Sequence, residues 1–324
     1  MTSCLCIITL IVVSTATIAN AGSDRIPRVG LLFSFSSGVN SDRIAAFRTG
    51  MRDLGYIEGN NIRIDYRHAD GRPDRLKDLA AELIAGKVDV IVSGGPAVTR
   101  PLKDATNTIP IVMAQDNDPI GNKFVGSLAR PGGNITGLST LAPEISGKRL
   151  EILKEVLAKI SRVAVFGSST FPGNAQMLKE TENAGGGFGV HVDYLDVRNS
   201  GELETAFRDS IRKHSDAGLV LANAIIFSER KRVASLAVKN RLPVIFPQSE
   251  YVDDGGLMSY APNYPDLFRR AATYVDKILK GSRAADLPVE QATKFELIVS
   301  LKAARQIGLT IPPNVLARAD RVIR

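Results

Sequence analysis

Residues 116–140 read DNDPIGNKFVGSLARPGGNITGLST, and this stretch separates two similar halves of the chain. Asp118-Pro119 ends an apolar run and opens a loop. The segment RPGGNITG (130–137) then holds too many turn residues for a helix, around a short strand-like piece at Ile135 and Leu138. Apolar runs alternate with amphipathic ones before the stretch, and the same alternation restarts after it. We interpret the stretch as a crossover between two lobes, with a functional cleft between them.

Apolar runs of strand length alternate with helix-like runs in both halves. The expected strands begin at residues 28, 61, 88 and 110 in the first half, and at residues 163, 191, 218 and 243 in the second. Nearly continuous apolar runs are typical of strands buried on both faces of a parallel sheet. Strands that alternate with helices form βαβ units. The sequence therefore predicts an α/β fold of two doubly wound, Rossmann-like lobes.

Two later segments are expected to cross between the lobes again, which gives three crossover strands in all. The segment GGLMSYAPN (255–263) mirrors the first crossover and would return the chain to the first lobe. A strand ending at Ser300 would cross a third time. The expected first lobe comprises residues 28–136 and 260–294, and the expected second lobe comprises residues 137–259 and 295–324.

The composition is that of a globular protein with a dispersed positive charge. Of 324 residues, 44% are apolar, and 41 Lys and Arg exceed 34 Asp and Glu, which gives a formal net charge of +7. The densest basic run, at 229–232, is expected to form the solvated face of a helix, and there is no arginine-rich arm. We therefore expect no nucleic acid partner.

The first 21 residues have the pattern of a signal peptide. An apolar run from Leu5 to Val13 is too short to span a bilayer, and Ala19-Asn20-Ala21 matches a cleavage site, although no Lys or Arg precedes the run. Cleavage after Ala21 would remove both cysteines, Cys4 and Cys6, so the mature chain would hold no disulfide and no cysteine metal ligand. The pattern predicts an exported, periplasmic protein.

Three phrases resemble a known family: GYIEGNNIRIDYR (55–67), DPIGNKFVGSLARPGGNITGLST (118–140) and FELIVSLKAARQIGLTIPPNVLARADRVI (295–323). They are similar to the substrate-binding proteins of a bacterial ABC-transporter family, some of which take up tryptophan or related aromatic amino acids. The resemblance covers nearly the whole mature chain. It implies the type I periplasmic-binding fold, in which two α/β lobes joined by three strands close on a ligand. It also implies a membrane permease with its ATPase as partners.

One loop departs from the family. Residues 34–38 read SFSSG, where the aromatic amino-acid-binding members carry a Glu-His-Pro-type loop. The resemblance therefore implies the fold and the transport role, but it does not assign tryptophan as the ligand. We expect a small molecule, namely an amino acid or another small carboxylate, aromatic ones included.

In open parallel sheets, ligands bind beyond the carboxyl ends of the strands, where loops meet helix N-termini. In the first lobe, the turn Gly94-Gly95-Pro96 opens a helix whose exposed N–H groups suit a carboxylate. The same turn is also consistent with a plain strand-to-helix connection. Asp118 is a candidate partner for a ligand ammonium, although Asp-Pro more often begins a turn. The candidate ligand-binding residues of the first lobe are Ser36, Ser37, Gly95, Pro96, Ala97, Thr99 and Asp118.

The second lobe offers candidates after its own strands. Phe171 or Phe227 could stack on a flat ligand, and each is also consistent with local packing. Glu250 is an alternative partner for a ligand ammonium and follows Gln248 in the loop after the eighth strand. The remaining candidates are Asn174 and Asn223 in the second lobe and Tyr260 in the second crossover. A ligand that contacts both lobes only when they are shut would favour the closed form.

An enzyme is one alternative class. The sequence has no G-x-S-x-G, no G-x-x-x-x-G-K-[ST] and no H-E-x-x-H motif. The glycine-rich run at 185–189 lacks dinucleotide-binding spacing and is expected to form a turn after a helix. His68, His191 and His214 are scattered, so no metal site is expected. We therefore expect no catalytic residues and no cofactor.

A ligand-sensing protein is the other alternative. Some transcription regulators share the two-lobe core, but they need a DNA-binding helix-turn-helix, and the segment before Arg28 holds only the signal-like apolar run. A sensor ectodomain that hands its ligand signal to a membrane receptor fits the same sequence features as a transport protein. Adjacent permease and ATPase genes would favour transport, and an adjacent histidine kinase gene would favour sensing.

Overall fold

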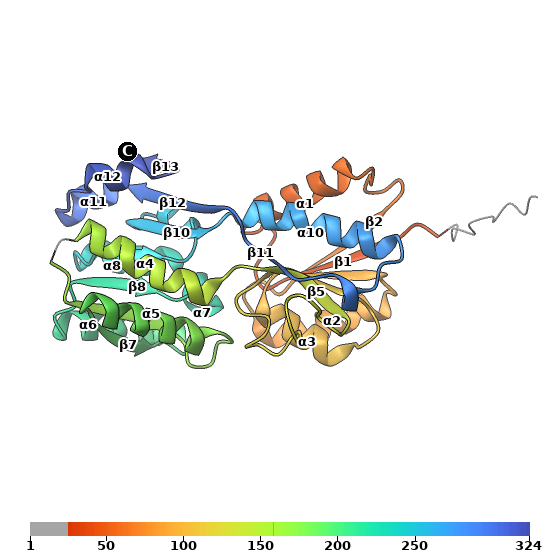
Figure 1. The fold of residues 1–324 in the computed structure, drawn as a ribbon, viewed down its shortest axis with the longest axis horizontal. Helices are drawn as coiled ribbons and strands as arrows, with labels where there is room; N and C mark the ends of the chain where they lie inside the picture. The colour runs from red at the N-terminus through yellow and green to blue at the C-terminus, as the bar shows by residue number, and fades with distance from the viewer. Residues whose placement is uncertain (1–24, 158) are drawn as a thin grey trace, which may run out of the picture.

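The computed structural model describes residues 25–157 and 159–324, and the expected signal peptide at residues 1–21 lies outside the described residues. The chain forms two α/β lobes that lie side by side, and the C-terminus belongs to the second lobe (Figure 1). Within the described ranges, the first lobe is built on a six-stranded sheet and the second on a seven-stranded sheet. None of the described helices is long and apolar enough to cross a membrane.

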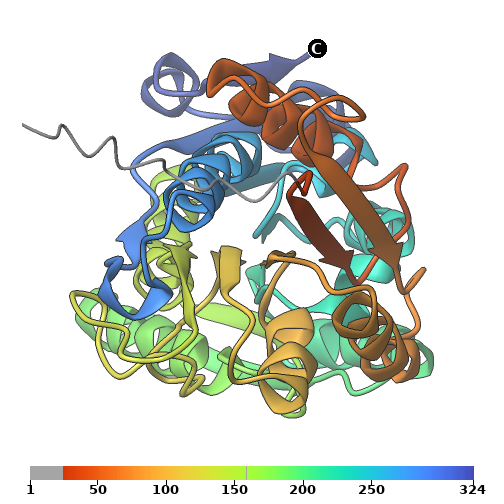
Figure 2. The ribbon, with the colours of Figure 1, turned by 90° about the vertical axis from the view of Figure 1, so that its right-hand side faces the viewer.

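The first lobe is a parallel sheet covered by helices on both faces. Its elements are β1 (Arg28–Phe33), α1 (Ser41–Asp53), β2 (Arg63–His68), α2 (Leu76–Ala85), β3 (Val90–Ser93), α3 (Pro96–Ala105), β4 (Ile111–Asp116), β5 (Ile135–Ser139), α10 (Tyr264–Leu279) and β11 (Glu290–Gln291), with short 3₁₀ helices at Pro73–Arg75 and Ala284–Asp286. The strand order is β11-β5-β4-β3-β1-β2. Helices α1 and α10 lie side by side on one face, and α2 and α3 cover the other (Figure 2).

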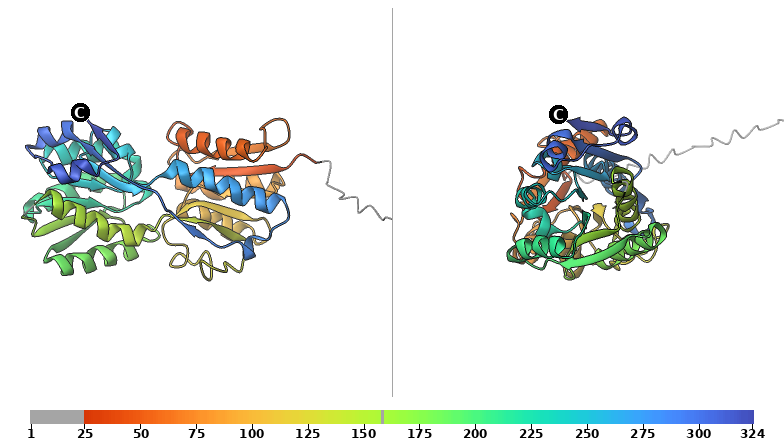
Figure 3. Two further views of the ribbon diagram at one scale, coloured as in Figure 1. Left: turned by 45° about the horizontal axis from the view of Figure 1, so that its top comes forward. Right: turned by 90° about the vertical axis from the view of Figure 1, so that its left-hand side faces the viewer.

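The second lobe has the same layered build. Its elements are α4 (Ala142–Val156), β6 (Arg162–Gly167), α5 (Asn174–Phe188), β7 (His191–Asp196), α6 (Leu203–Arg212), β8 (Ala217–Val220), α7 (Ala224–Ser228), α8 (Arg230–Lys239), β9 (Val244–Phe246), α9 (Glu250–Asp253), β10 (Met258–Pro262), β12 (Phe295–Ser300), α11 (Leu301–Ile307), α12 (Pro313–Ala317) and β13 (Arg321–Ile323), with a 3₁₀ helix at Ser200–Glu202. Helices α4 and α5 lie side by side on one face of the sheet, and α6 and α8 pack on the other (Figure 3).

The two sheets repeat one strand order, as the restarting pattern predicts. The order β2-β1-β3-β4-β5 in the first sheet matches β7-β6-β8-β9-β10 in the second. Both are parallel throughout these strands. The predicted α/β class with two doubly wound lobes is therefore confirmed. One feature was not expected, since β10 and β12 pair antiparallel within the second sheet, where β13 forms the edge beyond β12.

The strands run past the expected crossover positions. β5 pairs with β4 in the first sheet through Ser139, beyond the expected limit at 136/137. β10 pairs with β9 and β12 in the second sheet through Pro262, beyond the expected limit at 259/260. Turn residues set those expected limits, whereas strand pairing decides where the chain leaves a sheet. We propose that the chain crosses between the lobes near Thr140, near Asn263 and within residues 292–294.

Alternate residues of the central strands pack on opposite faces of the sheet. Leu31 lies in a buried cluster with Phe47 of α1 and Phe268 of α10, and the next residue, Leu32, lies in a second cluster with Leu83 of α2. All these side chains are at most 1% exposed. Burial of each contributes about 1.5–3 kcal/mol. Both faces of β1 are therefore core, which fixes the strand's register and the direction in which its carboxyl end points.

The glycine-rich run at 185–189 does not form a turn after the helix, as the sequence suggested. Helix α5 continues through Phe188, and Gly189, with φ 69°, ends it in the left-handed conformation. Gly185 has a packing role, because a Cβ there would lie 2.8 Å from the carbonyl oxygen of Val190.

Candidate ligand-binding site

A small cavity lies between the lobes at the carboxyl ends of their strands. Its volume is about 60 Å³. It is lined from the first lobe and the crossovers by Ser34, Phe35, Gly94, Gly95, Pro96, Ala97, Gln115, Asn117, Thr140 and Tyr264, and from the second lobe by Phe171, Ala222, Asn223, Ala224, Phe227 and Gln248. These residues follow β1, β3, β4, β6, β8 and β9 or lie at the crossovers. The site therefore lies where doubly wound sheets place ligands.

The turn before α3 presents backbone donors to this cavity. Gly95 has φ 129° and ψ 172°, a conformation that essentially only glycine adopts, and it is followed by Pro96 as the first helical residue. The N–H groups of Val98 and Thr99 donate to the Gly95 carbonyl oxygen at 3.0 and 2.9 Å. The N–H of Ala97 has no acceptor within the helix, because it belongs to the first turn. The positive end of α3 and this N–H suit an anionic group.

Two amides at the end of β4 carry unused hydrogen-bonding groups. The Gln115 Nε2 donates to the Gly94 carbonyl oxygen at 3.0 Å, and its Oε1 is buried with no partner among the described residues. The Asn117 Nδ2 is likewise buried without a partner in the described part of the chain. Buried polar atoms normally find a partner. One free acceptor and one free donor thus line the same cavity.

Aromatic rings close the cavity from both lobes. The ring centroids of Phe35 and Phe227 lie 4.9 Å apart, and this contact joins the loop after β1 to α7. Phe171 is half-buried in the loop after β6 and belongs to neither lobe's core. Burial raises the pKa of the Tyr264 phenol, so the hydroxyl stays protonated and can donate. Ring faces of this kind suit a flat ligand.

No charged side chain lines this cavity in residues 25–157 and 159–324. A ligand ammonium would therefore meet neutral oxygens, and a ligand carboxylate would meet N–H groups and the positive end of α3. The cavity is also smaller than ligand pockets usually are, which have about 300–1,000 Å³.

The structure brings together six of the residues chosen from the sequence: Gly95, Pro96, Ala97, Phe171, Asn223 and Phe227. The side chain of Asn223 is committed to the fold, since its Oδ1 accepts from the Ile226 N–H at 2.8 Å and its Nδ2 donates to the Leu221 carbonyl oxygen at 3.2 Å.

Three chosen residues have local structural roles and do not line the cavity. Thr99 is fully buried, and its hydroxyl contacts the Ser93 hydroxyl at 2.6 Å. Asn174 accepts from the Ser168 N–H at 2.8 Å and so holds the loop after β6. The carboxylate of Asp118 accepts from the Gly121 N–H at 2.9 Å and closes a turn. A residue's position after a strand does not reveal the direction of its side chain.

Four further choices lie elsewhere. Ser36 and Ser37 are exposed on the loop after β1. Tyr260 stacks on Phe295 at 5.9 Å between ring centroids, within the β10–β12 pair. Glu250 forms an ion pair with Arg43 of the first lobe at 2.6 Å, so its carboxylate already has a cationic partner in this structure.

Other residues that line the cavity were not chosen from the sequence. Gln115 is the penultimate residue of β4, and Asn117 is the first residue after it. Both lie at the carboxyl end of a strand, as the chosen residues do, so looking at the end of every strand in the same way identifies them. Tyr264 carries no such signal, because it begins α10 directly after the second crossover. The missed lining residues are Ser34, Phe35, Gln115, Asn117, Thr140, Ala222, Ala224 and Tyr264, whereas Gly94 and Gln248 lie in segments that the sequence had indicated.

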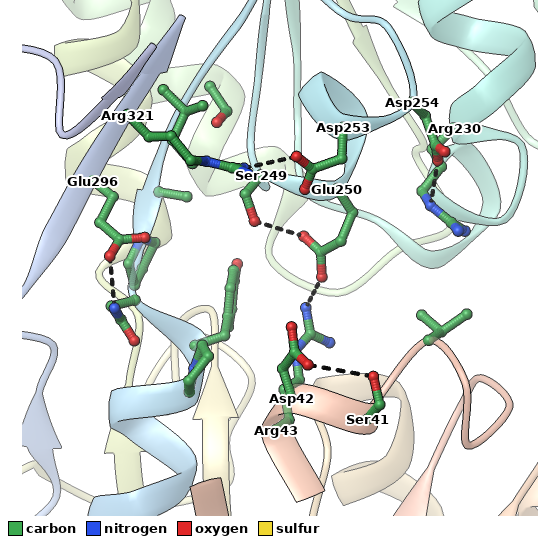
Figure 4. A pocket seen from close by; sticks show the side chains of 18 of the residues that line it. Ser41, Asp42, Arg43, Arg230, Ser249, Glu250, Asp253, Asp254, Glu296 and Arg321 are labelled. Atoms are coloured by element: carbon green, nitrogen blue, oxygen red, sulfur yellow. Dashed lines mark hydrogen bonds and ion pairs between the residues drawn. The ribbon is translucent and has the colours of Figure 1, made fainter. Parts of the chain in front are cut away.

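A second, larger cavity lies next to the first and also between the lobes. It has a volume of about 480 Å³, and Figure 4 shows the charged side chains that line it. Three ion pairs border it: Arg43–Glu250 at 2.6 Å, Arg230–Asp254 at 2.8 Å and Arg321–Asp253 at 2.8 Å. Tyr264 lines both cavities. We call the second one the charged interlobe cavity.

Two doubly wound lobes, with a cavity built from the strand ends of both, are the architecture of a two-lobed ligand-binding protein. The chain belongs to the family of ABC transporter substrate binding proteins, whose model matches residues 37–323. It is the solute-binding protein of an ABC transporter, and it is not an enzyme. The expected type I periplasmic-binding fold is confirmed.

Three similar proteins give the family relationship more detail. The tyrosine-binding protein of Clostridioides difficile (strain R20291) is 25% identical over 254 residues, which cover 78% of this chain and 73% of that protein. The crystal structure of a conserved domain protein from Vibrio cholerae is 28% identical with a TM-score of 0.86, over 92% of this chain and 100% of that one. An ABC domain from Streptococcus pneumonia in complex with L-Trp is 25% identical with a TM-score of 0.86, over the same shares of the two chains.

Proposed function

We propose that this chain is the extracytoplasmic receptor of an ABC importer for an amino acid, most suitably an aromatic one. The observation that carries the proposal is the lining of the 60 Å³ interlobe cavity. One side offers a free helix N-terminus with an unused donor and an unused acceptor, and the other sides offer aromatic rings. The tyrosine-binding and L-Trp-bound relatives support the same ligand class.

The ligand carboxylate would bind at the start of α3. The Ala97 N–H has no acceptor within its helix, and the buried Asn117 Nδ2 has no partner in the described chain. Together with the helix dipole they provide donors without a competing negative side chain nearby. A carboxylate there would satisfy groups that are costly to leave unpaired.

The ligand ammonium and ring would use the remaining groups. The Gln115 Oε1 is a buried acceptor without a partner among the described residues, and Gln115 lies at the end of β4, two residues before Asn117. Phe171 and Phe227 come from the second lobe and Phe35 from the first. A ligand held by its carboxylate in the first lobe and by its ring in the second would contact both lobes only when they are closed. Such a ligand shifts the open–closed equilibrium by its differential affinity.

Calorimetric titration with L-Trp, L-Tyr, L-Phe and aliphatic amino acids tests this proposal. The protein should first be unfolded, dialysed and refolded to remove any bound ligand. Phe171→Ala should weaken aromatic ligands by about 1–2 kcal/mol, or roughly 5- to 30-fold, because it removes a stacking surface. Phe188→Ala is the matched control, since Phe188 is also a half-buried ring of the second lobe but lies at the end of α5, outside the cavity. Equal losses in both variants, or no heat with any amino acid, would contradict the proposal.

Export and delivery complete the proposed role. The N-terminal residue of the protein recovered from the cell envelope should be Gly22, as cleavage after Ala21 implies. An intact N-terminus on a cytoplasmic protein would contradict export. In proteoliposomes, the ligand-loaded protein should stimulate ATP hydrolysis by its permease and ATPase. A sensor ectodomain would leave the transporter's ATP hydrolysis unchanged.

A further inference from the structure

One ion pair joins the two lobes directly. The Arg43 Nη2 lies 2.6 Å from the Glu250 Oε1, and the two residues are 207 positions apart in the sequence. Arg43 belongs to α1, which packs on the first sheet, and Glu250 begins α9, which packs on the second. Among the ion pairs of residues 25–157 and 159–324, it is the only one between the two lobes. Figure 4 shows the pair facing the charged interlobe cavity.

The first lobe holds its half of the pair firmly in place. The Arg43 side chain is only 5% exposed, and its guanidinium lies 4.7 Å from the centroid of the Tyr264 ring. Its Nη1 contacts the Asn40 Oδ1 at 3.4 Å. Stacking and burial leave the guanidinium little conformational freedom, so little entropy is lost when it meets a carboxylate. The Glu250 carboxylate is 26% exposed and contacts the Ser249 hydroxyl at 3.3 Å.

The pair lies behind the ligand cavity and not in it. Arg43 and Glu250 line the charged interlobe cavity, and neither lines the 60 Å³ cavity. Tyr264 lines both, so its ring separates the ligand cavity from the ion pair. Because Arg43 and Glu250 belong to different lobes, separation of the lobes would part the guanidinium from its carboxylate. The ion pair is therefore made only in the closed arrangement.

We propose that the Arg43–Glu250 ion pair is an interlobe latch that holds the lobes shut without ligand and so sets the affinity for every ligand by one common factor. This rests on the proposed function, in which ligand binds the closed lobes. The apparent dissociation constant is the intrinsic one divided by the fraction of protein that is closed. The latch changes that fraction and contacts no ligand. Arg43 and Glu250 are thus positioning residues for binding.

The test is a set of variants titrated with two ligands. Glu250→Gln keeps the shape of the side chain and removes its charge. The ligands are L-Trp and indole-3-propionate, which lacks the ammonium group. Loss of the latch should weaken both by the same factor, roughly tenfold (about 1.4 kcal/mol). A loss confined to L-Trp would overturn the proposal, because it would make Glu250 a direct partner of the ligand ammonium.

Two comparisons separate a latch from a general structural effect. Asp253→Asn is the matched control, because it removes the Arg321–Asp253 pair at 2.8 Å, which borders the same cavity but joins elements of one lobe. It should leave both affinities unchanged. Arg43→Gln combined with Glu250→Gln should cost no more than Glu250→Gln alone, since either change breaks the same pair. If the double variant binds either ligand more weakly than Glu250→Gln alone, the two residues act separately and the proposal is overturned.

A measurement without ligand keeps the latch testable if no aromatic ligand binds. The radius of gyration from small-angle X-ray scattering should be larger for ligand-free Glu250→Gln than for the wild-type protein. It should be unchanged for Asp253→Asn. Equal radii for all three proteins would overturn the latch, whereas a larger radius for Glu250→Gln supports it even if the proposed ligand class is wrong.

Discussion

Replacing Asp116 with Asn gives a sharp stability prediction. Asp116 ends β4 between Gln115 and Asn117, which line the ligand cavity, and its side chain is completely buried. Its Oδ1 accepts from the Asp118 N–H and from the Asn122 Nδ2, both at 3.0 Å, and its Oδ2 has no partner among the described residues. Burial raises the pKa of this carboxyl to about 7, although the two hydrogen bonds act to lower it.

The sign and size of the effect follow from that pKa. The folded value of about 7 lies above the unfolded value of about 3.9, so the folded protein keeps a proton that the unfolded chain releases. The stabilisation from this proton is fully present below about pH 4 and is lost as the pH rises through about 7. About three pKa units at 1.36 kcal/mol each set an upper bound of about 4 kcal/mol on the loss. The Asn side chain of Asp116→Asn does not ionise, so the variant does not lose this stability as the pH rises.

Urea unfolding of both proteins at about pH 4 and about pH 8 measures the effect, because all other titrating groups are shared and cancel in the difference. The two free energies of unfolding should agree within about 1 kcal/mol at the lower pH, since the two side chains have nearly the same volume. The variant should be more stable by about 2–4 kcal/mol at the higher pH.

The exposed Asp104, in the last turn of α3, provides the matched control. Asp104→Asn should change stability by no more than about 0.5 kcal/mol at either pH. A pH-independent difference for Asp116→Asn, or a variant less stable than the wild-type protein at the higher pH, would refute the reasoning from burial.

Two further predictions concern glycines. Gly95→Ala should cost about 1–3 kcal/mol of stability, because φ 129° with ψ 172° strains any other residue, and calorimetry should show weaker ligand binding as the start of α3 shifts. If Gly95→Ala binds ligand as tightly as the wild-type protein, the N-terminus of α3 is not part of the binding site. Gly137→Ala should destabilise more strongly, by at least about 2 kcal/mol in urea unfolding, because φ is 130° and the added Cβ would lie 2.2 Å from the Met113 carbonyl oxygen. If Gly137→Ala unfolds at the same urea concentration as the wild-type protein, β5 does not approach β4 that closely.

Much of the fold could be predicted from the sequence because burial leaves a periodic trace. The apolar runs mark strands covered on both faces, and their restart after residue 140 reveals the second lobe. The direction of β12 leaves no such trace, since an apolar run reads the same for parallel and antiparallel pairing. The crossover limits expected from the sequence differ from those we propose for a related reason: turn residues mark where a chain bends, but pairing carries β5 on to Ser139 and β10 on to Pro262.

The position of the candidate site in the fold could be predicted from the sequence, but many of the side chains that line it could not. The strand-end rule located the start of α3, yet Ala97 lines the cavity while Thr99, two positions on, turns back to Ser93. Helical rotation separates such neighbours, and a sequence without coordinates does not fix which of them faces the ligand. The Arg43–Glu250 pair could not be predicted from the sequence at all, because it depends on how the two lobes are placed relative to each other.

The most direct test of the central claim is a fluorescence titration with L-Trp. The chain contains no Trp, so emission excited beyond tyrosine absorption comes from the ligand alone. Binding between Phe35, Phe171 and Phe227 should shift that emission to shorter wavelengths and saturate, and L-Tyr or L-Phe should reverse the shift by competition. The contrary result is an emission that stays unchanged while the concentration of ligand-stripped protein is raised to about 1 mM. The binding free energy would then be at most about 4 kcal/mol, which would contradict a receptor for aromatic amino acids.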